Sequence, residues 1–284
     1  MLIKNKLITY SIYEIAYSAI SILVLITIFI FKEGLPLIIK IGIPNFILSK
    51  TWNPLHQQYG IFTMIVGSIW ITIGAIIVGV PLGISCSIYI VEYSPKMFGK
   101  ILKPMLELLA GIPSVVYGFM GVVILTPLIR QYFGGPGLSV LAGAIILGIM
   151  ILPTVVGISI DALQAVPKAY REGALALGAT HWQMIYKVVL PAAKQGIIAS
   201  VILAIGRAIG ETMAVIMVTG NAVKIPHSIL DTTRTLTANI ALEMGYATGD
   251  HARALFATGI VLFIFIMIIN IITNLTKGKY NKSS

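Results

Sequence analysis

Apolar runs long enough to cross a bilayer recur along this sequence of 284 residues. A chain in hydrocarbon has to satisfy its backbone hydrogen bonds internally, so these runs predict helices. We expect an all-α membrane protein with six transmembrane helices, at Ile12–Phe31, Phe62–Val91, Met105–Ile129, Leu138–Ile160, Gly196–Thr219 and Ala254–Leu275.

Composition agrees with lipid as the solvent. Only 11% of the residues are charged, whereas soluble proteins have about 25%. The net charge of +10 could suggest nucleic acid, but the basic residues lie in segments that flank the spans, where they set orientation. We therefore expect contact with membrane lipid and none with nucleic acid.

The distribution of Lys and Arg predicts which side each loop faces. With the N-terminus inside, twelve basic residues fall in inner segments and seven in outer ones. An excess of basic residues marks the cytoplasmic side. We expect a multi-pass protein of the cytoplasmic (inner) membrane, with both termini in the cytoplasm.

The cytoplasmic loop between the fourth and fifth predicted spans has the pattern of a helix, a break and a second helix. Pro167 suits a first turn, and Gly178 suits a left-handed end. Thr180 and Gln183 have the spacing of a capping box, and Pro191 is expected to end the second helix. Two short capped helices indicate a docking device; the alternative is an ordinary loop on the membrane face.

This loop resembles the coupling loop of bacterial ABC-importer permeases. The family pattern is E-A-A, three residues, G, nine residues and I-x-L-P, with Gly173 and Val188 replacing an Ala and the Ile here. The resemblance implies that loop 161–195, hereafter the coupling loop, docks on a separate ATPase subunit. The residues assigned to coupling are Arg171, Glu172, Ala174, Gly178, Leu190 and Pro191.

The sequence lacks the G-x-x-x-x-G-K-[ST] phosphate loop of an ATPase. It also lacks a nucleophile with a recognisable adjacent base, and its four His residues are scattered without metal-ligand spacing. We therefore expect no enzyme activity, no catalytic residue, no metal and no cofactor in this chain, with ATP hydrolysed on a partner.

Two charges lie within the fifth predicted span. Arg207 and Glu211 are one helical turn apart, which would place them on the same face. A charge at bilayer depth costs about 2.5–3.5 kcal/mol on insertion scales, so the two are expected to pair. Gly206 and Gly210 form a G-x-x-x-G motif, which predicts close approach of another helix.

These two side chains fit an oxyanion. The guanidinium of Arg207 matches two oxygens of a tetrahedral anion. The carboxylate of Glu211 would accept a hydrogen bond from a protonated oxygen, which hydrogen phosphate has and sulfate lacks. The pair therefore favours phosphate; the alternative is an ion pair that only fixes helix packing.

Three further segments resemble the phosphate-specific ABC importer permeases, most of all the PstC type, while the PstA type shares the fold. They are GRAIGETMAV, TWNPLHQQYG with the following GSIWIT, and IPSVVYGFMG. The resemblance implies a type I (MetI-like) bundle in which phosphate passes Arg207 and Glu211. It also implies a second homologous permease, two ATPase subunits and an extracytoplasmic phosphate-binding protein that lands on the outer segments 32–60 and 220–253.

We expect three parts along the chain. Residues 1–60 would form a first helix and outer loop, 61–277 the permease core, and 278–284 a cytoplasmic tail. Two other functions stay open at this point. The chain could be a permease for another oxyanion such as sulfate or molybdate, or a stand-alone channel or ion-coupled carrier.

Overall fold

The computed structural model describes residues 2–278, and their side chains at 12–95, 97, 101, 102 and 104–271. Residues 279–284 of the predicted tail, and several of the basic side chains counted for orientation, lie outside this part. The helices are α1 (Leu2–Ile41), α2 (Ile43–Leu48), α3 (Phe62–Ile88), α4 (Lys96–Gly111), α5 (Ser114–Met120), α6 (Thr126–Phe133), α7 (Val140–Gln164), α8 (Lys168–Ala176), α9 (His181–Met184), α10 (Leu190–Gly210), α11 (Met213–Val218), α12 (Leu236–Glu243) and α13 (Asp250–Gly278).

Six shorter elements join these helices. β1 (Trp52–Asn53) and β2 (Gln58–Tyr59) pair antiparallel as a hairpin around the 3₁₀ turn Pro54–His56. Three π-helical turns continue neighbouring α-helices, at Tyr89–Tyr93, Gly121–Leu125 and Ile185–Val189.

The predicted class is confirmed: six helical segments of the described chain are long and apolar enough to cross a membrane. They are Ile12–Ile41, Phe62–Tyr93, Ser114–Phe133, Val140–Gln164, His181–Gly210 and Asp250–Ile271. The second, fourth and sixth agree with the predicted spans within four residues at each end. The first continues ten residues further, to Ile41, and the third and fifth differ for identifiable reasons.

The third span does not begin at Met105. Helix α4 ends at Gly111, and Ile112 is extended (ψ 126°) because a residue before proline is disfavoured in the α conformation. A new helix begins at Ser114, directly after Pro113. The span therefore starts later than predicted, and Met105 belongs to the separate helix α4.

The fifth span starts earlier and ends earlier than predicted. Pro191 does not end the second helix of the coupling loop; it lies in the first turn of α10. The π-helical turn Ile185–Val189 joins α9 to α10, so the helical segment runs from His181 to Gly210. A proline is tolerated there because the preceding π turn has already changed the backbone hydrogen bonding.

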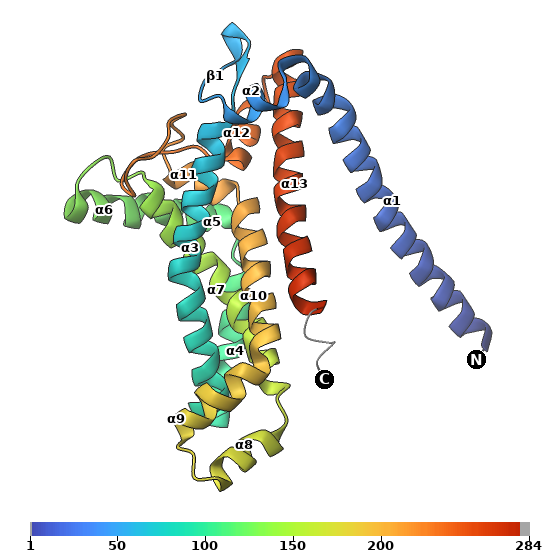
Figure 1. Ribbon diagram of the computed structural model, residues 1–284, viewed down its shortest axis with the longest axis vertical. Coiled ribbons are helices and arrows are strands. Elements are labelled where there is room, and N and C mark those ends of the chain that lie inside the picture. Colours follow the sequence, from blue (N-terminus) through green and yellow to red (C-terminus); the bar gives the residue numbers. More distant parts are fainter. Residues whose placement is uncertain (1, 279–284) are drawn as a thin grey trace.

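Helix α7 is the centre of the bundle, and α3 and α10 pack along it (Figure 1). Many α7 side chains are buried, including Leu147, Ile151 and Val155. Helix α1 meets α13 near its C-terminal part, where Phe29 and Phe256 form an edge-to-face pair with ring centroids 5.4 Å apart. The N-terminal part of α1 diverges from the bundle, and its apolar side chains from Ile12 to Ile28 are exposed.

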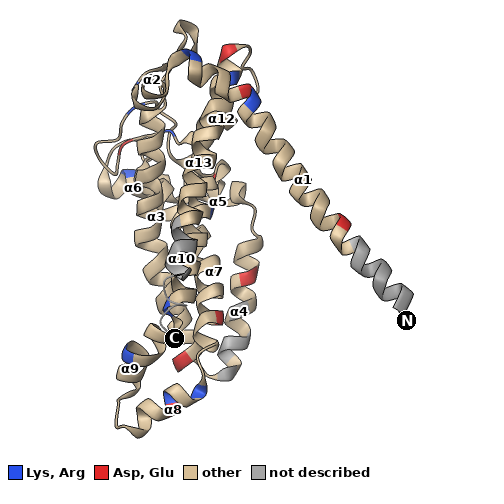
Figure 2. Ribbon diagram, turned by 45° about the vertical axis from the view of Figure 1, so that its right-hand side comes forward, with Lys and Arg blue, Asp and Glu red and all other residues tan. Residues whose placement is uncertain are grey.

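Charged residues gather at the two ends of the bundle (Figure 2). One group lies around α2 and α12, which we call the α12 end, and the other around α8 and α9, the α8 end. Helix α12 begins at Leu236 and holds Leu236 and Ile240 one turn apart. Its N-cap Thr235 accepts a hydrogen bond from the backbone N–H of Ala238 at 3.1 Å.

Glycines allow α3 and α7 to approach closely. A Cβ on Gly79 of α3 would lie 2.6 Å from the carbonyl oxygen of Gly148 on α7, and 2.7 Å from the Ile151 side chain. Without a hydrophobic driving force in lipid, such close packing of small residues is a main source of helix association. The two helices therefore depend on Gly79 remaining without a side chain.

We predict that Gly79→Ala destabilises the protein by about 1–3 kcal/mol, the usual cost of overpacking. Gly157→Ala on α7 is the control, because a Cβ there meets no atom within 4 Å. Thermal unfolding in detergent measures both variants. Equal unfolding temperatures for Gly79→Ala and the control would contradict this packing.

Candidate functional site

Arg207 lies in the last turn of α10 and its side chain is exposed in this chain. Its Nη1 donates a hydrogen bond to Oγ1 of Thr154 on α7 at 3.2 Å. The other guanidinium N–H groups have no partner within the described residues, so they are free to bind an anion. Arg207 thus presents unsatisfied cationic donors on a helix that crosses the membrane.

Glu211 is not on the same helix face as Arg207, contrary to the prediction. Helix α10 ends at Gly210, and Glu211 is extended (φ −69°, ψ 133°). Its Oε1 instead accepts hydrogen bonds from the backbone N–H groups of Thr212 at 3.0 Å and Ala214 at 3.2 Å. The carboxylate therefore caps the start of α11, where orphan N–H groups need an acceptor.

The expected Arg207–Glu211 ion pair is also absent from the ion pairs of the described residues. The sequence places the residues one turn apart, but the break after Gly210 removes the helical geometry on which that pairing depended. The two charged side chains have different partners: Arg207 donates to Thr154, and Glu211 accepts from the backbone N–H groups that follow it. Oε2 of Glu211 retains acceptor capacity.

Two cavities lie beside these residues. A small one of about 10 Å³ has Glu211 in its wall together with the hydroxyls of Ser68, Thr72 and Thr235; this is room for about one water molecule. A larger one of about 150 Å³ lies between α4 and α7, and its lining includes Glu107 and Thr154. Thr154 therefore joins Arg207 to the wall of the larger cavity.

The G-x-x-x-G face does not approach another helix of this chain. A Cβ built on Gly206 or Gly210 would meet no described atom within 4 Å. The predicted close approach is therefore not made by the described residues of this chain, and an approach by a helix of another subunit stays a prediction. Together with the exposed Arg207, these glycines form an open face at the end of α10.

The coupling loop folds as its caps predict. Gly178 has φ +83°, the left-handed conformation that favours glycine. Oγ1 of Thr180 accepts from the N–H of Gln183 at 3.2 Å, and Oε1 of Gln183 accepts from the N–H of Thr180 at 2.9 Å. The capping box is thereby confirmed, while Pro167 precedes the first helical residue of α8 instead of lying within its first turn.

Arg171, one of the residues assigned to coupling, points inward. Its guanidinium contacts Oε1 of Glu92 at 2.8 Å and donates to the backbone carbonyls of Leu163 and Val166. Ala174 is also buried, in an apolar cluster with Met184, which fixes the loop on the end of α7. These two residues hold the loop in place.

The outward surface of the coupling loop is apolar and aromatic. Leu177 is 91% exposed and Trp182 is 59% exposed. Glu172 is exposed beside them and has no hydrogen bond or ion pair to another described residue. Leu190 is partly buried against the inner cluster, and Pro191 starts α10. Of the residues predicted for coupling, Glu172 is therefore the charged one that faces outward.

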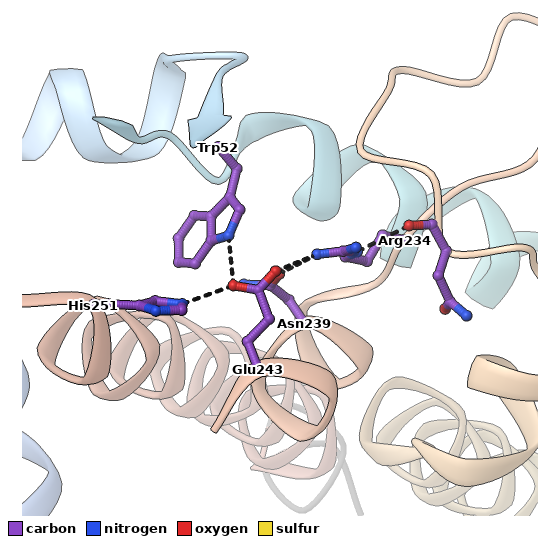
Figure 3. Close-up of polar contacts among 6 residues, drawn as sticks. Trp52, Arg234, Asn239, Glu243 and His251 are labelled. Atoms are coloured by element: carbon purple, nitrogen blue, oxygen red, sulfur yellow. Dashed lines mark hydrogen bonds and ion pairs between the residues drawn. The ribbon is translucent and has the colours of Figure 1, made fainter. Parts of the chain in front are cut away.

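A buried polar cluster at the α12 end went unpredicted. Glu243 is only 7% exposed, and donors from three other segments converge on its carboxylate (Figure 3). Arg234 contacts Oε1 at 2.6 Å, while Trp52 Nε1 at 2.9 Å and His251 Nε2 at 2.8 Å contact Oε2. Arg234 also donates to Asn239 at 3.0 Å.

This cluster joins the β1–β2 hairpin, α12 and the first turn of α13 through one carboxylate. The sequence carried no spacing signal for it, because Trp52 and Glu243 are 191 residues apart. The same holds for Glu92 and Thr154, which lie 79 and 53 residues from their partners Arg171 and Arg207. Only the tryptophan in the polar stretch TWNPLHQQYG could have pointed to this cluster.

Known proteins resemble this chain in sequence and in fold. The family described as "Binding-protein-dependent transport system inner membrane component" matches residues 79–279. The "Probable ABC transporter permease protein YqgH" of Bacillus subtilis is 43% identical over 265 residues, covering 89% of this chain and 86% of that protein. The "Phosphate transport system permease protein PstC" of Mesorhizobium japonicum is 37% identical over 246 residues, covering 79% and 75%.

Solved structures share the fold. A chain of a bacterial alginate ABC transporter, in complex with an alginate-bound periplasmic protein, superposes with a TM-score of 0.64 at 17% identity and covers 96% of both chains. A chain of the inward-facing MetNI methionine ABC transporter gives 0.57 at 17% identity, covering 80% of this chain and 97% of that one. The fold is that of type I ABC importer permeases, as predicted.

We predict that Glu243→Ala destabilises the protein by about 3–5 kcal/mol, because it leaves the buried Arg234 charge without its partner. Glu243→Gln, which keeps an acceptor oxygen, is expected to cost less. Thermal unfolding in detergent measures both. An alanine variant as stable as the wild type would show that the cluster does not hold the α12 end together.

Proposed function

Because the chain belongs to the family of binding-protein-dependent transport system inner membrane components, we propose that it is the transmembrane permease subunit of an ATP-driven phosphate importer. The observation that carries the substrate is Arg207, an exposed guanidinium in a membrane-crossing helix whose other donors have no partner among the described residues. Glu211, four residues later, has a carboxylate oxygen with spare acceptor capacity. Relatives named as phosphate permeases support the same substrate.

The proposed path runs along the open face at the end of α10. Arg207 would bind two oxygens of hydrogen phosphate in the geometry that suits a guanidinium. Oε2 of Glu211 would accept the hydrogen bond from the protonated oxygen. Sulfate lacks that proton at neutral pH, so Glu211 would repel it. The two cavities that Ser68 and Thr154 help to line would lie along the path.

A second homologous permease is proposed to close this path. The free approach at Gly206 and Gly210 supports a helix of that partner at this face. The exposed N-terminal part of α1 supports further contact outside the bundle, with the partner or with lipid. Residues 61–277 would form the permease core, and 1–60 the arm and outer hairpin.

The α8 end is proposed to be cytoplasmic, which places both termini inside. Two ATPase subunits would serve the permease pair, and each permease would dock through its coupling loop. The outward surface with Leu177, Trp182 and Glu172 is the proposed contact in this chain. ATP would be hydrolysed on those partners and not here.

The α12 end is proposed to face outward and receive an extracytoplasmic phosphate-binding protein. Its surface is formed by the β1–β2 hairpin, whose tip residue Leu55 is 93% exposed, and by the segment around α12. The Glu243 cluster supports this role because it makes the two parts of that surface one rigid unit.

Phosphate uptake by the complete complex in proteoliposomes tests the site. Arg207→Ala is expected to lower uptake by about tenfold or more, because it removes charge-assisted hydrogen bonds worth about 1.5–3 kcal/mol. Arg207→Lys is the matched variant: it keeps the positive charge but loses the planar guanidinium, which can donate to two oxygens at once. Excess sulfate should leave wild-type uptake unchanged; sulfate that competes as well as phosphate would overturn the substrate, and normal uptake by Arg207→Ala would reject the site.

The ATPase contact is tested at Glu172. Glu172→Lys reverses an exposed charge on the coupling loop and should reduce the recovery of ATPase subunits with the tagged permease by about tenfold, through like-charge repulsion. Glu172→Gln is the neutral control. Since the side chain has no described partner in its own chain, both variants should unfold at the wild-type temperature. Undiminished recovery with Glu172→Lys would remove Glu172 from the contact.

A further inference from the structure

We propose that the Arg171–Glu92 ion pair is the link through which movement of the coupling loop reaches α3. In this view Arg171 does not contact the ATPase, and Glu92 is a positioning residue for transport. The inference rests on the proposed function, and it assigns to one pair of side chains the mechanical step between ATPase closure and movement of the bundle.

The guanidinium of Arg171 holds three segments together. Its Nε and Nη2 donate to Oε1 of Glu92 at 3.1 and 2.8 Å. Its Nη1 donates to the carbonyl oxygen of Val166 at 2.7 Å, and Nη2 also donates to that of Leu163 at 2.8 Å. Arg171 is in α8, Glu92 is in the π-helical turn after α3, and the carbonyls belong to the end of α7 and the residues after it.

The burial of this pair makes it a firm connection. The side chains of Arg171 and Glu92 are 19% and 5% exposed. Exposed ion pairs contribute little because water and salt compete with them, whereas a partly buried, charge-assisted fork has no such competitor. By contrast, the Lys224–Asp231 pair at the α12 end is 3.7 Å apart and largely open to solvent. The Arg171 contact is thus suited to carrying a displacement.

Helix α3 and its π turn form one segment from Phe62 to Tyr93, long enough to cross the membrane. At its other end, Oγ of Ser68 accepts a hydrogen bond from the backbone N–H of Leu236 at 3.0 Å. Gly67 packs against the same segment, residues 234–236, because a Cβ on Gly67 would come 2.6 Å from the carbonyl oxygen of Arg234. A shift of α8 that moves Glu92 would therefore displace α3, and α3 would displace the residues at the start of α12.

Transport per ATP tests this link in the complete complex in proteoliposomes. Glu92→Ala is expected to lower the phosphate imported per ATP hydrolysed by about tenfold, a usual size for coupling between sites. Glu92→Gln keeps an acceptor for the Arg171 fork and should fall between the alanine variant and the wild type. ATP hydrolysis itself should persist, and ATPase subunits should be recovered in normal amounts.

A matched pair of arginine variants controls for general damage. Arg171→Lys keeps the charge but loses the fork, so it should also lower the ratio. Arg130→Lys is the control, because Arg130 of α6 likewise donates from two nitrogens to a backbone carbonyl, that of Pro136. Helix α6 lies well apart from α8 (Figure 1). Arg130→Lys should leave the ratio unchanged.

The outcomes separate this inference from the proposed function. A wild-type complex that imports no phosphate would reject the proposed function. A wild-type complex that imports phosphate, with a Glu92→Ala ratio equal to it, would overturn the link alone. A Glu92→Gln complex that fails to assemble would show that the pair serves folding only, which also contradicts the inference.

Discussion

A helix that breaks inside a membrane leaves backbone N–H groups that no water can satisfy, and this constraint organises the functional face of the protein. The break after Gly210 is repaired by Glu211, whose carboxylate caps the next helix. The backbone there is stabilised by a charged group of the chain itself. Arg207 lies at the end of α10, and Thr154 is its one hydrogen-bond partner among the described residues. The open face that remains there is the one proposed above to bind an anion.

Charge is arranged differently at the two ends of the bundle. At the α12 end, the buried carboxylate of Glu243 contacts Trp52, Arg234 and His251, which come from separate segments. At the α8 end, the guanidinium of Arg171 donates hydrogen bonds to the Glu92 carboxylate and to two backbone carbonyls at and after the end of α7. Both contacts join elements that are distant in sequence, and α3 runs between them. In the proposed mechanism, α3 would carry movement from one of these contacts to the other.

The local rules of the sequence predicted much of this structure. Apolar length predicted six spans, and the spacing of Thr180 and Gln183 predicted the capping box that is present. These features depend on residues a few positions apart. The break after Gly210 was not predicted, because Gly-Glu-Thr inside an apolar run is compatible with a continuous helix by propensity alone. The continuation through Pro191 was missed for a similar reason, since the π turn before it depends on packing against α7.

The predicted geometry of the site was wrong, while the part that its residues play in phosphate passage stays a prediction. Arg207 and Glu211 were expected to pair on one helix face, whereas each has a separate partner on another element or at the break. Arg171 was expected to face an ATPase and faces Glu92 instead. Such partners are set by how distant segments pack, and no spacing in a single sequence records that. Surface roles, such as that of Glu172, stay predictions.

Isolation of the tagged chain from its native membrane in mild detergent, followed by reconstitution, tests the central claim most directly. The account predicts that a second permease and ATPase subunits are recovered in fixed ratio, and that phosphate enters the vesicles only when ATP and the binding protein are supplied. Phosphate uptake by this chain alone, without ATP and without any nucleotide-hydrolysing partner, would contradict it.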